Sequence, residues 1–301
     1  MDFLMGILST IFKVDEQINN RNRNRRTKDN ITIESDIPYR EDEALDIYYD
    51  RLATMPMPVL INVHGGGWMV GDKKWRKGIA TIFAEHGFFV INPNYALSPA
   101  RLYPECITDI FEVIDWVVDN AERYNLDLGR LYITGDSAGG HIAAMVSAIQ
   151  HNEAELEKLH IPTPRAFITK VALFCGVYDY DKCVSQPGAQ GLVGDMTGVE
   201  YGKYVDEYEY HDELSPINYV DETFPVTYMV SATLDIFCSG QAELLHERLM
   251  TLDIYHEWYV PEDKMATHCF HLNLDRADSI EALWGAVDFL KADITTLTNR
   301  K

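Results

Sequence analysis

The chain has few cysteines, and they follow no pattern. Its 301 residues include five, namely Cys106, Cys175, Cys183, Cys238 and Cys269. Their number is odd, they are scattered, and no C-x-x-C spacing occurs, so neither a disulfide framework nor a zinc site is indicated. This cysteine usage fits a reducing compartment, and we predict a cytoplasmic protein.

Basic residues and long apolar runs are also scarce. Lys and Arg total 26 against 47 Asp and Glu, which gives a formal net charge of -21. Phosphate contacts need clustered Lys and Arg, so nucleic acid is not an expected partner. No stretch is apolar over the roughly 20 residues that a membrane-spanning helix needs. Repeats and low-complexity tracts are absent from the sequence as well.

The amino end is the one region where composition shifts. Residues 3–12 are mostly apolar with helical spacing, and a basic stretch follows at residues 21–28. A secretory signal would carry its positive charge before the apolar run, so this order is the reverse of one. Two interpretations remain for residues 1–30: a helix that packs over the rest of the protein as part of a cap, or an amphipathic helix resting on anionic lipid. Membrane contact is therefore expected only through this helix, and the cap is the favoured interpretation.

The rest of the chain alternates between short apolar runs and helical patterns. This alternation predicts one α/β domain over residues 31–301, with a mostly parallel sheet flanked by helices and a small cap. The predicted strands are 31–36, 44–50, 57–63, 88–92, 130–134, 169–175, 225–231 and 255–260. The predicted helices are 73–86, 104–122, 138–152, 238–251 and 279–292.

Gly135-Asp136-Ser137-Ala138-Gly139 is the most informative motif. It follows a predicted strand and precedes a predicted helix, so Ser137 lies on a strand-turn-helix corner. Glycine on both sides allows a sharp turn that exposes the serine hydroxyl, as in a nucleophile elbow. The hydroxyl of Ser137 is therefore the candidate nucleophile.

A second glycine-rich segment follows an earlier strand. His64-Gly65-Gly66-Gly67-Trp68 comes directly after the apolar run that ends at Val63. Glycines at a strand end allow backbone N–H groups to approach an anion closely, and an oxyanion hole combines such a loop with the N–H after the nucleophile, here Ala138. A phosphate-binding loop is disfavoured, because no Lys-Ser or Lys-Thr follows at the required spacing.

The serine requires a base and an acid, expected in the order Asp or Glu and then His. Asp235 falls just past the strand predicted at 225–231, and His268 lies in the loop after the strand at 255–260. His271 lies on the same loop and remains the alternative base. His64 and His141 also flank the predicted site. Cys269, beside His268, lacks an elbow of its own and is predicted to be a small buried filler rather than a nucleophile.

Together these motifs resemble the hormone-sensitive-lipase-like group of α/β-hydrolase carboxylesterases, including bacterial acetyl esterases. The resemblance covers nearly all of residues 31–292 and implies the α/β-hydrolase fold. It further implies oxyanion donors at Gly66, Gly67 and Ala138, and a match of the group's His-x-Phe to His268-Cys269-Phe270. One departure is Ala96, which stands where the group carries an arginine, within Asn94-Tyr95-Ala96-Leu97-Ser98-Pro99.

The predicted function is hydrolysis of small acyl esters through an acyl-enzyme on Ser137, without metal or cofactor. The expected partner is a small-molecule ester, while the oligomeric state is not readable from the sequence. An amide or formamide hydrolase resembling an arylformamidase would use the same three residues, and a non-catalytic ligand-binding member of the fold is a further alternative. An insertion at about 177–214, rich in tyrosine and acidic residues, is expected either to shape the substrate pocket or to form a solvated surface segment.

Overall fold

The structure is a computed structural model that describes residues 29–185, 196–197 and 207–298. Residues 1–28, nearly all of the predicted amino-terminal cap, lie outside the described residues, as do residues 186–195 and 198–206, which are half of the predicted insertion. In the part that is described, no helix is both long and apolar enough to cross a membrane.

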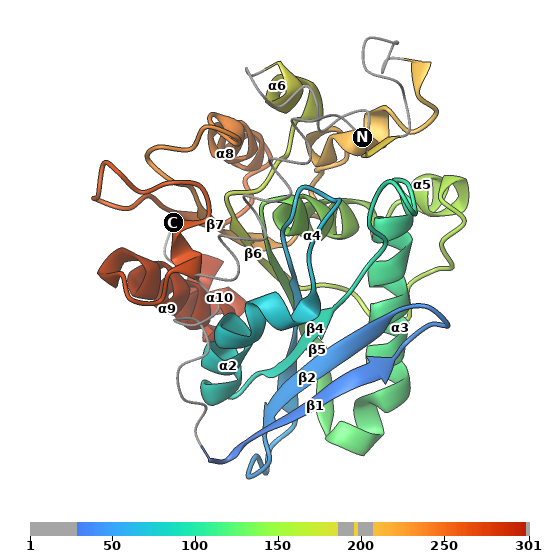
Figure 1. Ribbon diagram of the computed structural model, residues 1–301, viewed down its shortest axis with the longest axis vertical. Helices are drawn as coiled ribbons and strands as arrows, with labels where there is room; N and C mark the ends of the chain where they lie inside the picture. The colour runs from blue at the N-terminus through green and yellow to red at the C-terminus, as the bar shows by residue number, and fades with distance from the viewer. Residues whose placement is uncertain (1–28, 186–195, 198–206, 299–301) are drawn as a thin grey trace.

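Eight strands form a single sheet in the order β1-β2-β4-β3-β5-β6-β7-β8 (Figure 1). The first two pairings, β1 with β2 and β2 with β4, are antiparallel, and all later pairings are parallel. The strands are β1 (Ile31–Pro38), β2 (Ala44–Asp50), β3 (Met57–Val63), β4 (Phe89–Pro93), β5 (Leu126–Asp136), β6 (Lys170–Phe174), β7 (Val226–Val230) and β8 (His256–Tyr259).

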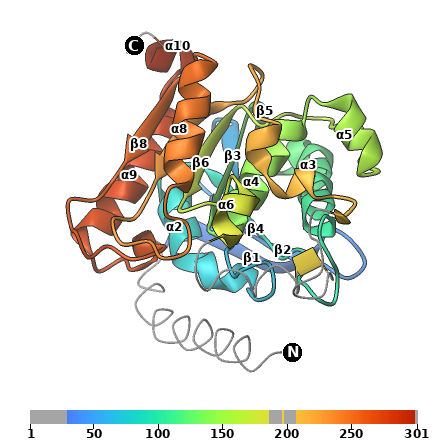
Figure 2. The same ribbon diagram turned by 90° about the horizontal axis from the view of Figure 1, so that it is seen from above.

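Helices cover both faces of this sheet, as Figure 2 shows. One face packs against α3 (Glu105–Tyr124), α4 (Ala138–Ile149), α5 (Glu153–Lys158) and α8 (Gln241–Thr251). The other packs against α2 (Lys77–Glu85), α9 (Ala277–Lys291) and α10 (Ile294–Thr298). The central strands are buried on both faces, which explains why their sequences are continuous apolar runs.

The predicted mostly parallel sheet with flanking helices is confirmed, with local corrections. The helix predicted at 73–86 is wrong as one unit, because it divides into the 3-10 helix η1 (Lys73–Arg76) and α2. The strand predicted at 130–134 is longer, since β5 begins at Leu126. Short helices that the sequence did not predict are α5, α6 (Tyr180–Val184), α10, η3 (Asp212–Leu214), η4 (Pro216–Asn218) and η5 (Phe270–Leu272).

The described ends of the predicted insertion pack into the body of the domain. Tyr178 and Tyr180 are each 1% exposed. The amide of Gln241 on α8 accepts hydrogen bonds from the backbone N–H groups of Tyr178 and Asp179, at 2.7 and 2.8 Å. These tyrosines are core residues, so the alternative of a solvated segment does not apply to them.

Candidate active site

Ser137 sits at the sharp corner between β5 and α4. Its backbone has φ 52° and ψ −120°, a left-handed conformation that a side chain adopts only at a cost of about 1–3 kcal/mol. The Ser137 N–H donates to the carbonyl of Phe174 at the end of β6, at 2.9 Å, and His141 N–H donates back to the Ser137 carbonyl at 3.0 Å. The corner is therefore held from both sides.

A hydrogen-bonded chain joins Ser137 to the two loops that follow β7 and β8. His268 Nε2 lies 2.9 Å from Ser137 Oγ, and His268 Nδ1 lies 2.8 Å from Asp235 Oδ2. Because an ionised carboxylate can only accept, Nδ1 carries the proton and donates to Asp235, which leaves the Nε2 lone pair facing the serine hydroxyl. This tautomer is the one needed to remove the serine proton.

Asp235 is itself fixed by the backbone of its own loop. Its Oδ1 accepts hydrogen bonds from Phe237 N–H at 2.9 Å and from Cys238 N–H at 2.8 Å. Burial alone raises the pKa of Asp235, but the hydrogen bond and charge of His268, with these two N–H groups, outweigh it and lower the pKa. The carboxylate is thus ionised at neutral pH and points one oxygen at the imidazole.

The Asp235–His268 pair shifts the pKa of the histidine in the opposite direction to that of the carboxyl group. Burial lowers the pKa of His268, while the hydrogen bond and negative charge of Asp235 raise it, and the net result is a raised pKa. A base whose pKa lies close to the working pH is the most effective proton acceptor. The arrangement can therefore take a proton from Ser137 and return it to a leaving group.

The glycine loop after β3 runs directly against the serine corner. A Cβ placed on Gly65 would lie 2.4 Å from Asp136 Oδ2 and 3.2 Å from Ser137 Cβ, while one on Gly139 would lie 2.2 Å from the carbonyl of Val63. Any larger residue at either position would force the loop and the helix apart. Close contact of backbone with backbone is what these two glycines permit.

His141 anchors this loop rather than taking part in proton transfer. Trp68 Nε1 donates to His141 Nδ1 at 3.1 Å, so His141 Nε2 carries the hydrogen and donates to the Leu214 carbonyl at 3.0 Å. The imidazole is fully buried, and burial lowers its pKa to about 4. It links the glycine loop, α4 and η3 as a neutral group.

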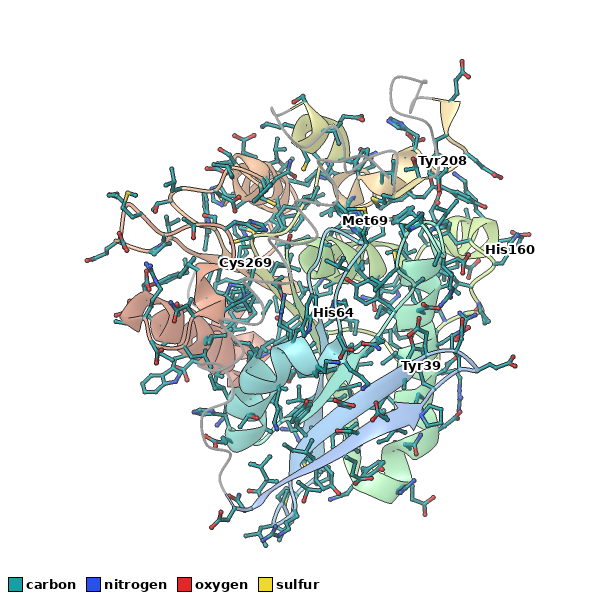
Figure 3. All side chains as sticks on the ribbon, viewed as in Figure 1. Tyr39, His64, Met69, His160, Tyr208 and Cys269 are labelled. Atoms are coloured by element: carbon teal, nitrogen blue, oxygen red, sulfur yellow. The ribbon has the colours of Figure 1, made fainter. Side chains whose placement is uncertain are left out.

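The other two histidines near the site are also buried. The His271 ring stacks on Phe174 with centroids 4.4 Å apart, and it is His268, not His271, that bonds to Ser137. His64, labelled in Figure 3, stacks on Tyr95 at 4.4 Å, and burial lowers its pKa to about 4. The geometry thus favours His268 over His271 as the base.

A buried ion pair that the motifs gave no signal for lies behind the serine. Arg76 Nε and Nη2 donate to Asp136 Oδ1 and Oδ2 at 2.6 and 2.7 Å. Burial raises the pKa of Asp136, but the Arg76 guanidinium more than compensates and holds it at about 2. The residue before the nucleophile is therefore a fixed carboxylate, and nothing in the local sequence around Arg76 marks it as the partner.

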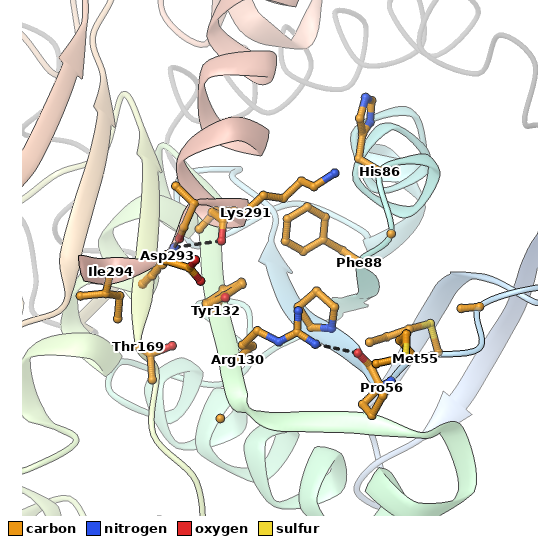
Figure 4. Close-up of a pocket in the computed structure, with 18 of the residues that line it drawn as sticks. Met55, Pro56, His86, Phe88, Arg130, Tyr132, Thr169, Lys291, Asp293 and Ile294 are labelled. Atoms are coloured by element: carbon orange, nitrogen blue, oxygen red, sulfur yellow. Dashed lines mark hydrogen bonds between the residues drawn. The ribbon is translucent and has the colours of Figure 1, made fainter. Parts of the chain in front are cut away.

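A cavity of about 700 Å³ lies at the other end of the sheet (Figure 4). Its lining includes Phe88 just before β4, Arg130 and Tyr132 in the middle of β5, and Lys170 at the start of β6. Lys170 donates to the carbonyls of Phe289, Leu290 and Ala292, where α9 ends. Lys170 is thus engaged in holding the fold, whereas Ser137 follows the carboxyl end of β5.

Similarity to solved structures agrees with this architecture. Esterase B from Lactobacillus rhamnosis superimposes with a TM-score of 0.83 at 22% identity, over 99% of this chain and 96% of the other. The Pyrobaculum calidifontis esterase does so with a TM-score of 0.73 at 18% identity, over 97% and 93%. At such identities the likeness establishes the α/β-hydrolase fold.

Sequence relatives point the same way, although each match is partial. Esterase LipQ of Mycobacterium tuberculosis is 30% identical over 211 residues, which is 67% of this chain and 48% of LipQ. Carboxylesterase NlhH of the same species is 32% identical over 116 residues, 38% of this chain and 34% of NlhH. The chain thus spans about half the length, or less, of these curated relatives. The predicted resemblance to esterases is confirmed.

A family model also matches most of the domain. The BD-FAE model covers residues 45–249, from β2 to α8, well over half of the chain. That span contains the glycine loop, the Ser137 corner and Asp235. Since the model matches this much of the domain, the chain belongs to the BD-FAE family.

Proposed function

We propose that this protein is a serine carboxylesterase that hydrolyses small acyl esters through an acyl-enzyme on Ser137. The observation that carries the proposal is the hydrogen-bonded chain from Asp235 through His268 to Ser137. His268 Nε2 takes the proton as Ser137 Oγ attacks the ester carbonyl, and Asp235 stabilises the imidazolium. The proton then passes to the departing alcohol, and a water repeats the cycle to release the acid.

The oxyanion formed in each step requires hydrogen-bond donors. We assign the backbone N–H groups of Gly66, Gly67 and Ala138, because Gly66 and Gly67 lie in the loop that runs against the serine corner and Ala138 begins α4. Loss of one such donor typically raises the barrier by about 2.7–4 kcal/mol. The positive end of α4 adds to the same field.

Amide or formamide hydrolysis is the second candidate, since it would use the same three residues. The named relatives are esterases, so ester hydrolysis is favoured. Cleavage of p-nitrophenyl acetate compared with p-nitroacetanilide separates the two activities. An amide turnover faster than the ester turnover would replace the esterase proposal.

The test of the nucleophile uses Ser137→Ala, with Ser147→Ala on the same helix as its control. The Ser147 hydroxyl donates to Ala143 within α4 and is buried away from the chemistry. Ser137→Ala should abolish hydrolysis and labelling by a fluorophosphonate while the circular dichroism spectrum is unchanged. Residual labelling at another residue would refute the assignment.

The test of the base compares His268→Ala with His271→Ala. His268→Ala should lower kcat by roughly a thousandfold or more, because Ser137, His268 and Asp235 act as a unit and removing one of them abolishes most of the rate acceleration that all three provide. His271→Ala should retain far more turnover once its folding is verified. The reverse ranking would make His271 the base.

Residues 1–28 are proposed to form part of a cap over the site, and a cytoplasmic location remains a prediction from the cysteine content. Deletion of residues 1–28 should alter substrate preference or stability but leave hydrolysis of p-nitrophenyl acetate. If the deletion removed only binding to lipid droplets or vesicles, this segment would be a lipid-surface anchor instead.

A further inference from the structure

Two thiols that the hydrolytic mechanism does not use lie beside His268. Cys175 follows β6 and Cys269 follows His268 in the chain, and both are free cysteines. The sulfur atoms of Cys175 and Cys269 and a ring nitrogen of His268 all lie within 4.8 Å of one another. Three donor atoms of the kind that bind soft metals therefore converge at one point.

The backbone holds both thiols in place. Cys175 has φ 48° and Cys269 has φ 55°, left-handed conformations that cost a side chain about 1–2 kcal/mol. Cys175 N–H donates to the Val230 carbonyl at 2.8 Å, and the Cys269 carbonyl accepts from Leu272 N–H at 3.0 Å. Cys269, labelled in Figure 3, also places its sulfur 3.8 Å from Asp136 Oδ2. The backbone of both cysteines is thus fixed by hydrogen bonds to neighbouring segments.

We propose that Cys175, Cys269 and His268 form an inhibitory site for a soft divalent cation, with Zn²⁺ as the reference ion. This inference rests on the proposed function, because its effect is exerted through the catalytic base. Zinc binds thiolates at about 2.3 Å and imidazole at about 2.0 Å in a tetrahedron, so its ligand atoms stand roughly 3.5–3.8 Å apart. Because the three donor atoms lie within 4.8 Å of one another, their separations must shorten by at most roughly 1.3 Å to reach that geometry.

Charge and protons balance in this binding step. The two thiols release two protons to solvent as they become thiolates, and the dication is then neutralised by the two negative sulfurs. His268 binds as a neutral imidazole through the nitrogen that carries no hydrogen. A water molecule completes the tetrahedron.

Inhibition follows from the tautomer of His268. Its Nδ1 holds the proton that is donated to Asp235, so the free lone pair is on Nε2, 2.9 Å from Ser137 Oγ. A metal ion on that lone pair occupies the position of the serine proton. Metal binding and activation of Ser137 therefore exclude each other, and removal of the metal restores activity.

A second donor set shares the same histidine but is a poorer site. Asp235, Cys238 and His268 also place their donor atoms within 4.8 Å of one another. Both oxygens of Asp235 are engaged, Oδ1 with two backbone N–H groups and Oδ2 with His268. A metal there would break these bonds and would meet one thiolate instead of two. Cys238 consequently provides the matched control.

The first experiment measures ester hydrolysis at buffered free Zn²⁺ concentrations, followed by EDTA. Each variant is compared with itself, with and without metal, so its basal rate does not enter the result. Micromolar Zn²⁺ should inhibit the unmodified protein at least tenfold, and EDTA should restore activity. Cys175→Ser combined with Cys269→Ser should raise the Zn²⁺ concentration that halves activity by at least about a hundredfold. In Cys238→Ser this concentration should equal that of the parent.

The second experiment measures binding without using activity. Co²⁺ added to Ser137→Ala should produce thiolate-to-cobalt charge-transfer absorption in the near ultraviolet, which the Cys175→Ser and Cys269→Ser substitutions should remove. A failure of the esterase proposal would leave this absorption intact, so the two failures are distinguishable. Absence of the absorption in the protein with both thiols, or undiminished zinc inhibition in the double variant, overturns the proposal.

Discussion

Replacing Arg76 with alanine should lower the free energy of unfolding substantially, although Arg76 lies far from the serine motif in the sequence. The guanidinium makes two charge-assisted bonds to Asp136, at 2.6 and 2.7 Å, and the two side chains are only 4% and 5% exposed. Asp136 also touches the glycine loop, since a Cβ on Gly65 would lie 2.4 Å from its Oδ2. Arg76 therefore fixes Asp136, which contacts the glycine loop and directly precedes Ser137 in the chain.

The size of the effect follows from the pKa of Asp136. Burial favours the neutral acid, yet Arg76 lowers the pKa to about 2 from an ordinary value of 3.8. That difference corresponds to roughly 2 kcal/mol in favour of the ionised form, after the burial cost has been met. In Arg76→Ala this preference is lost and the carboxyl remains buried, so the free energy of unfolding at pH 7 should fall by about 3–5 kcal/mol.

The pH dependence distinguishes this cause from simple loss of packing. Because the folded pKa of Asp136 is depressed, the ion pair contributes stability above the unfolded pKa of about 3.9, and this is lost as pH falls towards 2. In Arg76→Ala the folded pKa is raised, so that variant regains stability when the carboxyl protonates. The difference in the free energy of unfolding between the unmodified protein and Arg76→Ala should therefore decrease steadily as the pH is lowered.

Urea denaturation of both proteins between pH 7 and pH 4 measures this difference. Arg165→Ala is the control, because Arg165 pairs with Asp119 at the surface, where the side chains are 51% and 62% exposed. Exposed pairs contribute at most about 1 kcal/mol. A loss in Arg76→Ala no larger than in the control, or one that does not change with pH, would refute the reasoning.

Local sequence patterns were sufficient to predict the strands of the sheet, because each strand is a short apolar run bounded by turn residues. They were insufficient for the start of β5. Leu126 and Asp127 pair with Met57 and Pro58 of β3 across a register shift. The stretch Asp127-Leu128-Gly129-Arg130 has turn-like composition, and residues 128–130 are passed over in the register, because Val59 pairs with Leu131. The early start of β5 therefore depends on the pairs made by Leu126 and Asp127, which composition does not indicate.

The candidate site divides in the same way. Ser137, the glycine loop and His268 belong to motifs whose residue types are dictated by backbone geometry and chemistry, so the sequence could indicate them. Arg76 with Asp136, and Cys175 with Cys269, meet only through the tertiary fold. No characteristic spacing in the sequence relates the members of these two pairs, so their roles can be recognised only from their contacts in the structure.

Two further predictions concern catalysis directly. Asp235→Asn removes the charge that raises the pKa of His268, so the acid limb of the pH profile of kcat/KM should move to lower pH. Its maximal kcat should fall by roughly a thousandfold or more, because the imidazole loses its fixed tautomer; an unmoved acid limb would point to another acid, such as Asp253 or Glu262. For substrate size, kcat/KM over a p-nitrophenyl ester series should peak between acetyl and about hexanoyl. Each methylene buried in a closed pocket contributes about 0.8 kcal/mol, roughly fourfold, until the pocket is full. Longer chains then clash with its wall, and rates should drop. A steady rise up to long-chain triglyceride emulsions would mean that the site opens to a lipid surface and that the small-ester proposal is wrong.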